Sequence, residues 1–279
     1  MPAGNVYLVP VPIGNLGDIT LRALDTLRSV ALIACEDTRK TRFLLSQYEI
    51  KPPRLLSLHK YNEKQRLTEI LALLQEGGDL AVVTAAGSPG ISDPAQYLIG
   101  ACLSAGIRIV PLPGATALLP AVIGSGLDCS QFQFLGFLPL RLKQRQARLE
   151  QLREYHGTSI VYEAPHRLRK TLEDILTVCG DRYICLAREL TKLHEEFVRG
   201  RLRDLLEGYN VTEKGEFVIV LEGLTPVAED ASGDISAFLD AAIKSKTSLR
   251  EQAAEISRRF GLSRNKAYQM VLEHRAGKS

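Results

Sequence analysis

The chain has 279 residues, of which 45% are hydrophobic and 24% are charged, and its formal net charge is +3 at pH 7. This length allows two compact domains of ordinary size or one large α/β domain, and the composition is typical of globular rather than disordered or fibrous proteins. The longest apolar runs, such as residues 117–126, are too short to cross a bilayer and contain Pro and Gly, so no membrane span is predicted.

The predicted elements begin with short apolar runs that alternate with segments of helical periodicity. Strands are predicted at residues 6–10, 31–35, 55–58, 80–84 and 107–111. Helices are predicted at residues 20–30, 38–47, 62–76, 93–105 and 116–123. A repeated strand, helix and strand indicates a parallel sheet covered by helices on both faces, so we predict a first α/β domain over residues 1–124.

A second series follows the Gly-Ser-Gly turn at residues 124–126 and a polar stretch. Strands are predicted at residues 132–137, 159–162, 183–187, 195–199 and 217–221, and helices at residues 143–155 and 167–179. We therefore predict a second α/β domain over residues 125–225. Ligands of such sheets bind beyond the carboxyl ends of the strands, so a cleft between the two domains is the expected place for a small-molecule site.

Residues 226–279 are predicted to be a linker and a helical extension. Residues 226–234 are acidic and small, with Pro and Gly, as in linkers. Ser248 and Glu251 form a capping-box pattern, Gly261 suits a helix stop, and Ser263 can cap a second helix. Two interpretations stay open: a helix-turn-helix that contacts DNA, and the commoner packed helical hairpin.

The first residues run directly into a strand pattern, without the basic start and long apolar stretch of a secretion signal. We therefore expect a cytoplasmic protein. The cysteines are odd in number, widely spaced and form no C-x-x-C pair, which predicts neither a disulfide framework nor a metal site.

Familiar nucleotide-binding motifs are missing. No G-x-G-x-x-G follows a strand, and the terminal Gly277-Lys278-Ser279 has Leu272 where a P-loop requires its first glycine. Three Gly/Pro turns, at residues 12–17, 86–94 and 112–117, instead follow predicted strands of the first domain. Glycine lets a ligand touch backbone amides and proline stiffens a loop, so these turns predict a preorganised small-molecule site.

The residues of these turns and of several later blocks together form a recognisable sequence pattern. They are VPIGNLGDITLRAL at 11–24, CEDTR at 35–39, ISDP at 91–94, LPG at 112–114, GFLP at 136–139, YEAPHR at 162–167 and ARELTK at 187–192. In this order they strongly resemble the ribosomal RNA small-subunit 2′-O-methyltransferases of the tetrapyrrole methylase superfamily, over about residues 5–275. The first and last blocks are typical of the ribosomal branch rather than of porphyrin-making enzymes.

The resemblance implies two α/β domains with S-adenosylmethionine in the cleft between them, a homodimer, and no membrane. It implies that the acceptor is the ribose 2′-OH of a cytidine in the 16S rRNA of the small ribosomal subunit. By position, it assigns cofactor binding to Pro12, Gly14, Asn15, Gly87, Ser88, Pro89, Ile91, Ser92, Asp93, Pro113, Gly114, Ala115, Thr116, Ala117, Leu138, Tyr162, Arg188, Glu189, Leu190, Thr191 and Glu216.

One position departs from the family pattern. An aspartate usually precedes the Ala-Gly of the turn after the fourth strand, whereas this chain has Ala85, whose side chain accepts no hydrogen bond. A catalytically weakened member that binds RNA or the ribosome therefore stays open. So does a tetrapyrrole methyltransferase, which would need a broad apolar pocket.

Methyl transfer from a sulfonium is an in-line displacement that needs no metal. Alignment of the donor carbon with the acceptor oxygen is therefore expected to give most of the reduction in the activation barrier. A ribose hydroxyl is a poor nucleophile, and a positioned base helps to remove its proton. The candidate catalytic residues are Glu36, Asp37, Arg39, Glu163 and Glu189. Structural roles are also open, because Arg39 can pair with Asp37 at a helix start and Glu163 can hold the turn at residues 166–167.

Lys and Arg outnumber Asp and Glu in residues 36–66 and 139–154. Such runs either contact the phosphate backbone of RNA or are simply solvated helix faces. The candidate phosphate contacts are Arg39, Lys40, Arg42, Arg141, Lys143, Arg145 and Arg148. The chain has no Trp and few aromatic residues, so we expect recognition of a folded ribosomal subunit rather than of a free strand.

Overall fold

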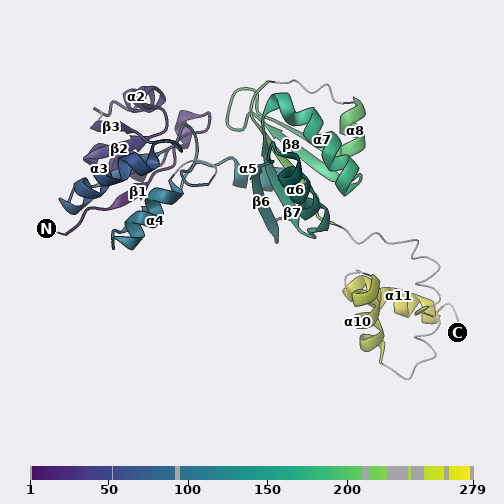
Figure 1. The fold of residues 1–279 in the computed structure, drawn as a ribbon. Coiled ribbons are helices and arrows are strands. Elements are labelled where there is room, and N and C mark those ends of the chain that lie inside the picture. Colours follow the sequence, from purple (N-terminus) through teal and green to yellow (C-terminus); the bar gives the residue numbers. More distant parts are fainter. Residues whose placement is uncertain are drawn as a thin grey trace. The chain divides into compact units, whose positions relative to one another are not determined.

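The computed structural model describes residues 2–51, 53–91, 95–208, 214–224, 238–239, 248–260 and 264–276 (Figure 1). Contacts divide the chain into one unit over residues 1–224 and another over residues 225–279. The first unit contains two five-stranded sheets, one from each predicted α/β domain.

The first sheet is entirely parallel, with the strand order β3-β2-β4-β1-β5. Its strands are β1 (Val6–Leu8), β2 (Leu32–Cys35), β3 (Arg54–Ser57), β4 (Leu80–Val83) and β5 (Ile109–Pro111). Its helices are α1 (Leu21–Ser29), α2 (Thr38–Gln47), α3 (Glu63–Gln75) and α4 (Gln96–Ser104). The doubly wound parallel arrangement predicted from the alternation of elements is confirmed.

Alternation along β2 shows how helices cover both faces of this sheet. Leu32 and Ala34 join the core formed with α3 and α4, whereas Ile33 and Cys35 join the core formed with α1 and α2. All four residues are buried, as expected for a strand covered on both sides. Because the strands are parallel, the segments that follow β1, β2, β4 and β5 meet at one edge.

The second sheet is mixed, with the strand order β6-β7-β10-β8-β9. Only the pairing of β6 with β7 is parallel. Its strands are β6 (Phe132–Phe137), β7 (Thr158–Glu163), β8 (Tyr183–Arg188), β9 (Glu196–Arg201) and β10 (Phe217–Leu221). Helices α6 (Leu142–Glu154) and α7 (Pro165–Cys179) were predicted, whereas the short elements η1 (Leu16–Asp18) and α8 (Leu202–Gly208) were not.

The two faces of β10 also bury different partners. Phe217 and Ile219 pack with α6, α7 and α8, whereas Val218 and Val220 pack with α5 (Leu118–Ser125). Helix α5, which the sequence assigns to the first domain, therefore contributes to the core of the second sheet. The segment before it, which carries the third Gly/Pro turn, connects the two sheets.

The second unit contains helices α10 (Leu249–Phe260) and α11 (Arg264–Ala276). They share a small core of Leu239, Ala253, Ile256, Ala267 and Val271. The predicted capping box is confirmed, because the Ser248 backbone amide donates to Glu251 Oε2 at 2.9 Å and the Glu251 amide donates to Ser248 Oγ at 3.3 Å. The predicted linker at 226–234, Gly261 and Ser263 lie outside the described residues. In the ranges described, no helix is long and apolar enough to cross a membrane.

Candidate active site

The three Gly/Pro turns after β1, β4 and β5 are tied together at the carboxyl edge of the first sheet. Val11 and Gly87 exchange two backbone hydrogen bonds, of 3.0 and 2.9 Å. Gly87 has φ +75°, a conformation that disfavours any side chain, and a Cβ there would lie 3.4 Å from Cγ2 of Ile13. The Ser88 hydroxyl donates to the Ala115 carbonyl at 3.1 Å. The turns thus form one connected wall.

A hollow of about 440 Å³ lies against this wall, and we call it the Gly87 hollow. Both sheets line it, and its volume is in the range of roughly 300–1,000 Å³ usual for small-molecule sites. The predicted cofactor residues that line it are Gly87, Ser88, Ile91, Thr116, Ala117, Tyr162, Leu190 and Glu216. The structure therefore brings together residues that lie up to half the chain apart in sequence.

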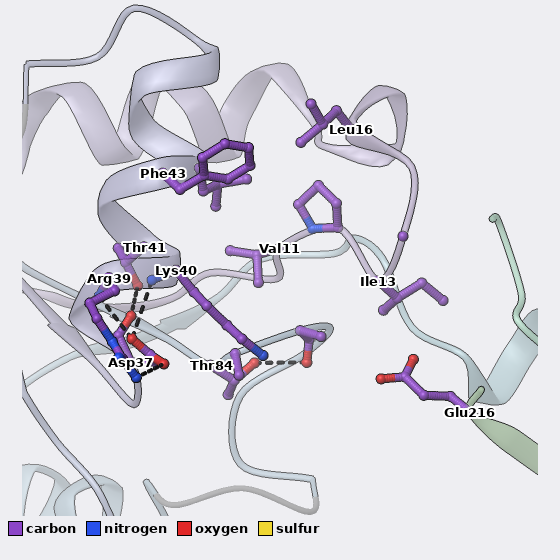
Figure 2. Close-up of a pocket in the computed structure, with 15 residues that line it drawn as sticks. Val11, Ile13, Leu16, Asp37, Arg39, Lys40, Thr41, Phe43, Thr84 and Glu216 are labelled. Atoms are coloured by element: carbon purple, nitrogen blue, oxygen red, sulfur yellow. Dashed lines mark hydrogen bonds and ion pairs between the residues drawn. The ribbon is translucent and has the colours of Figure 1, made fainter. Parts of the chain in front are cut away.

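A second hollow, of about 680 Å³, lies beside the first, and we call it the Phe43 hollow. It is formed by the turn after β1, the start of α2, the turn after β4 and Glu216. In Figure 2 the Phe43 ring lies over one side, Lys40 extends across the hollow towards Thr84, and Glu216 faces it from the other side. The two hollows are contiguous, because they share Ile13, Ala85, Ala86 and Glu216.

Asp37 lines the Phe43 hollow and is also the N-cap of α2. Its Oδ1 accepts hydrogen bonds from the backbone amides of Arg39 at 2.8 Å and Lys40 at 3.2 Å, and these bonds lower the pKa of the carboxyl. The Arg39 guanidinium lies 3.5 Å away. The structural role considered for this pair, at a helix start, is confirmed.

Glu163 lines the Gly87 hollow from the end of β7, with its side chain fully buried. One carboxylate oxygen accepts from the Thr171 hydroxyl at 2.6 Å, and the other accepts from the Ala164 amide at 2.9 Å. Nε of Arg167 lies 3.4 Å from the latter oxygen. Glu163 therefore holds the turn into α7, which confirms the structural role considered for it.

Glu36 has a less occupied carboxylate. Its Oε2 accepts one hydrogen bond, from the Ala85 backbone amide at 3.4 Å, and both residues line the Gly87 hollow. The residue that directly follows β2 thus places a carboxylate beside Ala85, the position that departs from the family pattern.

Loops from the two sheets touch at one point beside the hollows. The backbone amide of Asn15 donates to the Thr191 hydroxyl at 3.1 Å. Gly14 packs so closely on the same loop that a Cβ would lie 2.3 Å from Cγ of Lys192. Thr191 has φ +67°, which is rare for a β-branched residue and marks a conformation held by its surroundings. We call residues 14–15 with 191–192 the clasp.

Glu189 stands behind the clasp, with φ +50°. Its Oε1 accepts from Nζ of Lys192 and from the backbone amide of Glu216, each at 2.9 Å. Burial raises the pKa of Glu189, but these hydrogen bonds and the positive charges of Lys192 and Arg188 together outweigh it, and the net pKa is lowered. Lys192 also lies 3.1 Å from Glu216, so this network supports one rim of both hollows.

The remaining predicted residues are distributed as follows. Pro12, Gly14, Asp37 and Arg39 line the Phe43 hollow. The residues that line neither hollow are Asn15, Pro89, Pro113, Gly114, Ala115, Leu138, Arg188, Glu189 and Thr191. Ser92 and Asp93 lie outside the described residues.

Two of the residues outside the hollows have clear structural partners. Leu138 is 1% exposed in the core of the second sheet, and its carbonyl accepts from Arg167 at 2.7 Å. Arg188 donates to the Lys214 carbonyl at 3.0 Å and lies 3.3 Å from Glu196.

Sequence reasoning missed the apolar lining, above all Ile13, Phe43 and Phe137. Phe43 could have been recognised from the sequence, because it is a large aromatic residue within a basic helical segment. Of the candidate phosphate contacts, Arg145 is turned inward, since it lies 2.8 Å from Asp174 and its side chain is 13% exposed. Within the described residues, no three His, Cys, Asp or Glu side chains form a group that could hold a metal ion.

A family model described as tetrapyrrole (corrin/porphyrin) methylases matches residues 5–206. Curated relatives share the name ribosomal RNA small subunit methyltransferase I. The relative from Synechocystis sp. is 46% identical, over 97% of this chain and 98% of its own. The relative from Escherichia coli O157:H7 is 43% identical, over 97% and 95%. The relative from Thermotoga maritima is 47% identical over 221 residues, which are 79% of this chain and 99% of its own.

Solved structures support the same fold at lower identity. The methyltransferase CobJ superposes with a TM-score of 0.61 at 22% identity, over 79% of this chain and 95% of its own. Uroporphyrin-III C-methyl transferase from Thermus thermophilus, complexed with S-adenyl homocysteine, superposes with a TM-score of 0.56 at 19% identity, over 78% and 97%. The chain therefore belongs to the tetrapyrrole (corrin/porphyrin) methylase family, and within it to the ribosomal RNA small subunit methyltransferase I family.

Proposed function

We propose that the protein transfers a methyl group from S-adenosylmethionine to the ribose 2′-OH of a cytidine in the 16S rRNA of the small ribosomal subunit. The observation that carries this proposal is the Gly87 hollow, lined from both sheets by the turns that resemble the cofactor turns of the family. The shared name of the relatives supports small-subunit rRNA as the acceptor.

The residues of the Gly87 hollow fit S-adenosylmethionine. Gly87 and Ala86 expose backbone to the ligand, Ser88 and Thr116 offer hydroxyls, and Leu190 with other apolar residues can cover an adenine ring. When bound, S-adenosylmethionine supplies an electrophilic methyl group on a sulfonium. The chain must then exclude water, align the acceptor and remove its proton.

We assign the removal of the proton to Glu36. Asp37 is engaged in capping α2, Glu163 has three partners in the turn to α7, and Glu189 lines neither hollow. Glu36 accepts one weak hydrogen bond and lies next to Ala85, which belongs to both hollows. Glu36→Gln should lower kcat by roughly a hundredfold or more, with the Kd for cofactor unchanged.

We further propose a cytoplasmic homodimer that acts without a metal. Exposed apolar residues on α5, Leu119 at 47% and Ile123 at 71%, support a second copy as the partner of this helix. Sedimentation of the wild type and of Ile123→Glu tests this proposal. We expect a dimer and a monomer, respectively, and a monomeric wild type would contradict it. We keep 1–124 and 125–225 as proposed domain limits along the sequence, with α5 at the end of the first range packed on the second sheet.

The function is tested by incubating the purified protein and labelled S-adenosylmethionine with undermethylated small subunits, naked rRNA and a porphyrinogen. We expect label in subunit RNA, at a ribose 2′-oxygen. Label in the tetrapyrrole alone would overturn the proposal and favour the tetrapyrrole methyltransferase, for which the solved structures supply a likeness of fold at 19–22% identity.

Because Ala85 departs from the family pattern, a second candidate function is a family member that binds RNA or the ribosome with weakened methyltransferase activity. Calorimetric titration with S-adenosylmethionine separates this case. Binding is expected because the backbone and hydroxyl groups of Gly87, Ser88 and Thr116 line the Gly87 hollow whatever residue stands at position 85. The absence of binding would sink both enzyme proposals.

A further inference from the structure

We infer that the Phe43 hollow receives one nucleotide of the RNA acceptor, with its base on the Phe43 ring and its phosphate at Lys40. The inference rests on the proposed function, because that function makes the acceptor an RNA. It adds the place where the acceptor binds and two residues that no motif of the family indicated.

Phe43 provides an aromatic face at the hollow. The residue is 63% exposed on α2, whereas phenylalanine is normally buried. Val11 and Leu16 add apolar surface to the same hollow. Exposed rings of this kind bind unstacked bases of any sequence, because every base has a π face.

Lys40 provides the charge for a phosphate. Across the described ranges of the chain, its ammonium group has no ion-pair partner, and it extends across the hollow in Figure 2. At the start of α2, Asp37 already accepts from two of the backbone amides, and its negative charge disfavours a phosphate there.

The other charged residues of the hollow are largely balanced. Arg39 pairs with Asp37, and Lys192 pairs with Glu216 at 3.1 Å. Lys40 is thus left as the uncompensated charge among the described residues that line the hollow, and it favours an anion.

The residues shared by the two hollows determine which part of the nucleotide lies next to the methyl donor. Ile13, Ala85, Ala86 and Glu216 line both the Phe43 hollow and the Gly87 hollow, so the two hollows meet at these residues. A base at Phe43 and a phosphate at Lys40 leave the ribose between them, next to these residues. A volume of about 680 Å³ accommodates a nucleotide turned out of the folded RNA, as enzymes that modify single nucleotides require.

The kinetic test compares two pairs of variants on undermethylated small subunits. Phe43→Ala should raise KM for the subunit by about tenfold, whereas Phe43→Tyr should remain close to wild type. Lys40→Met should raise KM and reduce the slope of log(kcat/KM) against log salt by about 0.7–0.9, whereas Lys40→Arg should keep the slope. The Kd for S-adenosylmethionine should not change in any of these variants.

Two controls lie at the opposite, amino edge of the first sheet. Leu103→Ala removes another exposed apolar side chain, at the end of α4, and Arg108→Met removes another exposed cation, just before β5. Both should retain the wild-type KM for the subunit. If they raise it as much as the test variants do, the effects are general ones of charge or stability and the inference fails.

A second measurement uses the absence of tryptophan from the chain. Phe43→Trp introduces a single indole at the hollow, and Leu103→Trp introduces one at the control position. Millimolar cytidine 5′-monophosphate should quench the first and leave the second unchanged. Unchanged emission of Phe43→Trp would overturn the stacking role.

The outcomes separate this inference from the proposed function. If the wild type methylates subunit RNA while Phe43→Ala and Lys40→Met keep the wild-type KM and salt slope, the inference is wrong and the proposed function stands. If the wild type transfers no methyl group to RNA, the proposed function falls, and this inference falls with it.

Discussion

At the scale of single residues, the acidic side chains around the two hollows differ in how fully they are occupied by partners. Glu163 is buried with three partners, whereas Glu36 has one distant amide. A carboxylate that already accepts several short hydrogen bonds is engaged with its structural partners, and its removal leaves those donors unsatisfied. Mutation of these residues should therefore separate stability from chemistry.

Glu163→Gln should lower the free energy of unfolding by about 1–3 kcal/mol, because the amide cannot satisfy Thr171 and Arg167 together in a buried site. Urea denaturation measures this change. Glu173→Gln, in α7 at an ion pair that is about half exposed, is the control and should cost less than about 0.5 kcal/mol. A Glu163→Gln protein as stable as wild type but inactive would instead identify Glu163 as the base.

Glu189 should make stability depend on pH in the acid range. The folded pKa lies below the ordinary value of 4.5, so the carboxylate stabilises the fold above about that pH, and the contribution is lost as pH falls through the folded pKa. The stability difference between wild type and Glu189→Gln should therefore be large at pH 7 and shrink at lower pH in urea titrations. On a Lys192→Met background the same substitution should show little pH dependence. A difference that stays constant down to acid pH would refute this account.

The sequence predicted the partners of some residues and not of others. Asp37 followed by Arg39 and a helical pattern indicates a cap, because capping depends on neighbours in sequence. Phe43 was not recognised, because its role depends on the turns after β1 and β4, which reach α2 only in the folded chain.

At the scale of elements, the clasp joins the turn after β1 to the loop after β8. These segments belong to different sheets, so their contact sets how far the lining of the hollows can separate. The positive φ values of Glu189 and Thr191 show that the loop is held there against its local preference.

Gly14→Ala should open the clasp, because its Cβ would lie 2.3 Å from Cγ of Lys192 and 3.0 Å from the Thr191 hydroxyl. We expect the affinity for S-adenosylmethionine to fall about tenfold by calorimetry, which corresponds to about 1.4 kcal/mol. The matched control is Gly100→Ala in α4, where nothing lies within 4 Å of the added Cβ. It should keep wild-type affinity and gain about 0.5–1 kcal/mol of stability. If the two variants bind S-adenosylmethionine with equal affinity, the clasp does not contribute to cofactor binding.

Most elements followed from the sequence, since periodicity reports which side of a segment is buried. What periodicity does not report is the partner that buries it. Helix α5 shows this, because its apolar residues would fit either sheet, and they pack on the second. The antiparallel pairings of β10 were equally beyond prediction, because a fully buried strand has the same pattern in either direction.

At the scale of the whole molecule, all residues that line the two hollows lie in the unit over residues 1–224. The relative from Thermotoga maritima aligns over 99% of its length with 221 residues of this chain. A chain of about that size therefore suffices for a member of this family.

A chain ending at Leu224 should accordingly fold and bind S-adenosylmethionine within about twofold of the wild-type Kd. The separate core around Ile256 gives the second unit its own packing, so its removal leaves the two sheets intact. Calorimetry and thermal unfolding of the shortened protein check this. Loss of cofactor binding in a folded truncation would mean that residues 225–279 contribute to the site.

The residues shared by the two hollows have a consequence for the catalytic cycle. Ile13 and Glu216 line both hollows. A change in their side-chain positions when S-adenosylmethionine binds therefore also changes the surface that the RNA contacts. By thermodynamic reciprocity, whatever factor the donor contributes to RNA affinity, RNA returns to the donor. In the proposed reaction the sulfonium becomes a neutral thioether, so donor and product differ in charge, and a different reciprocal factor with RNA is expected for each.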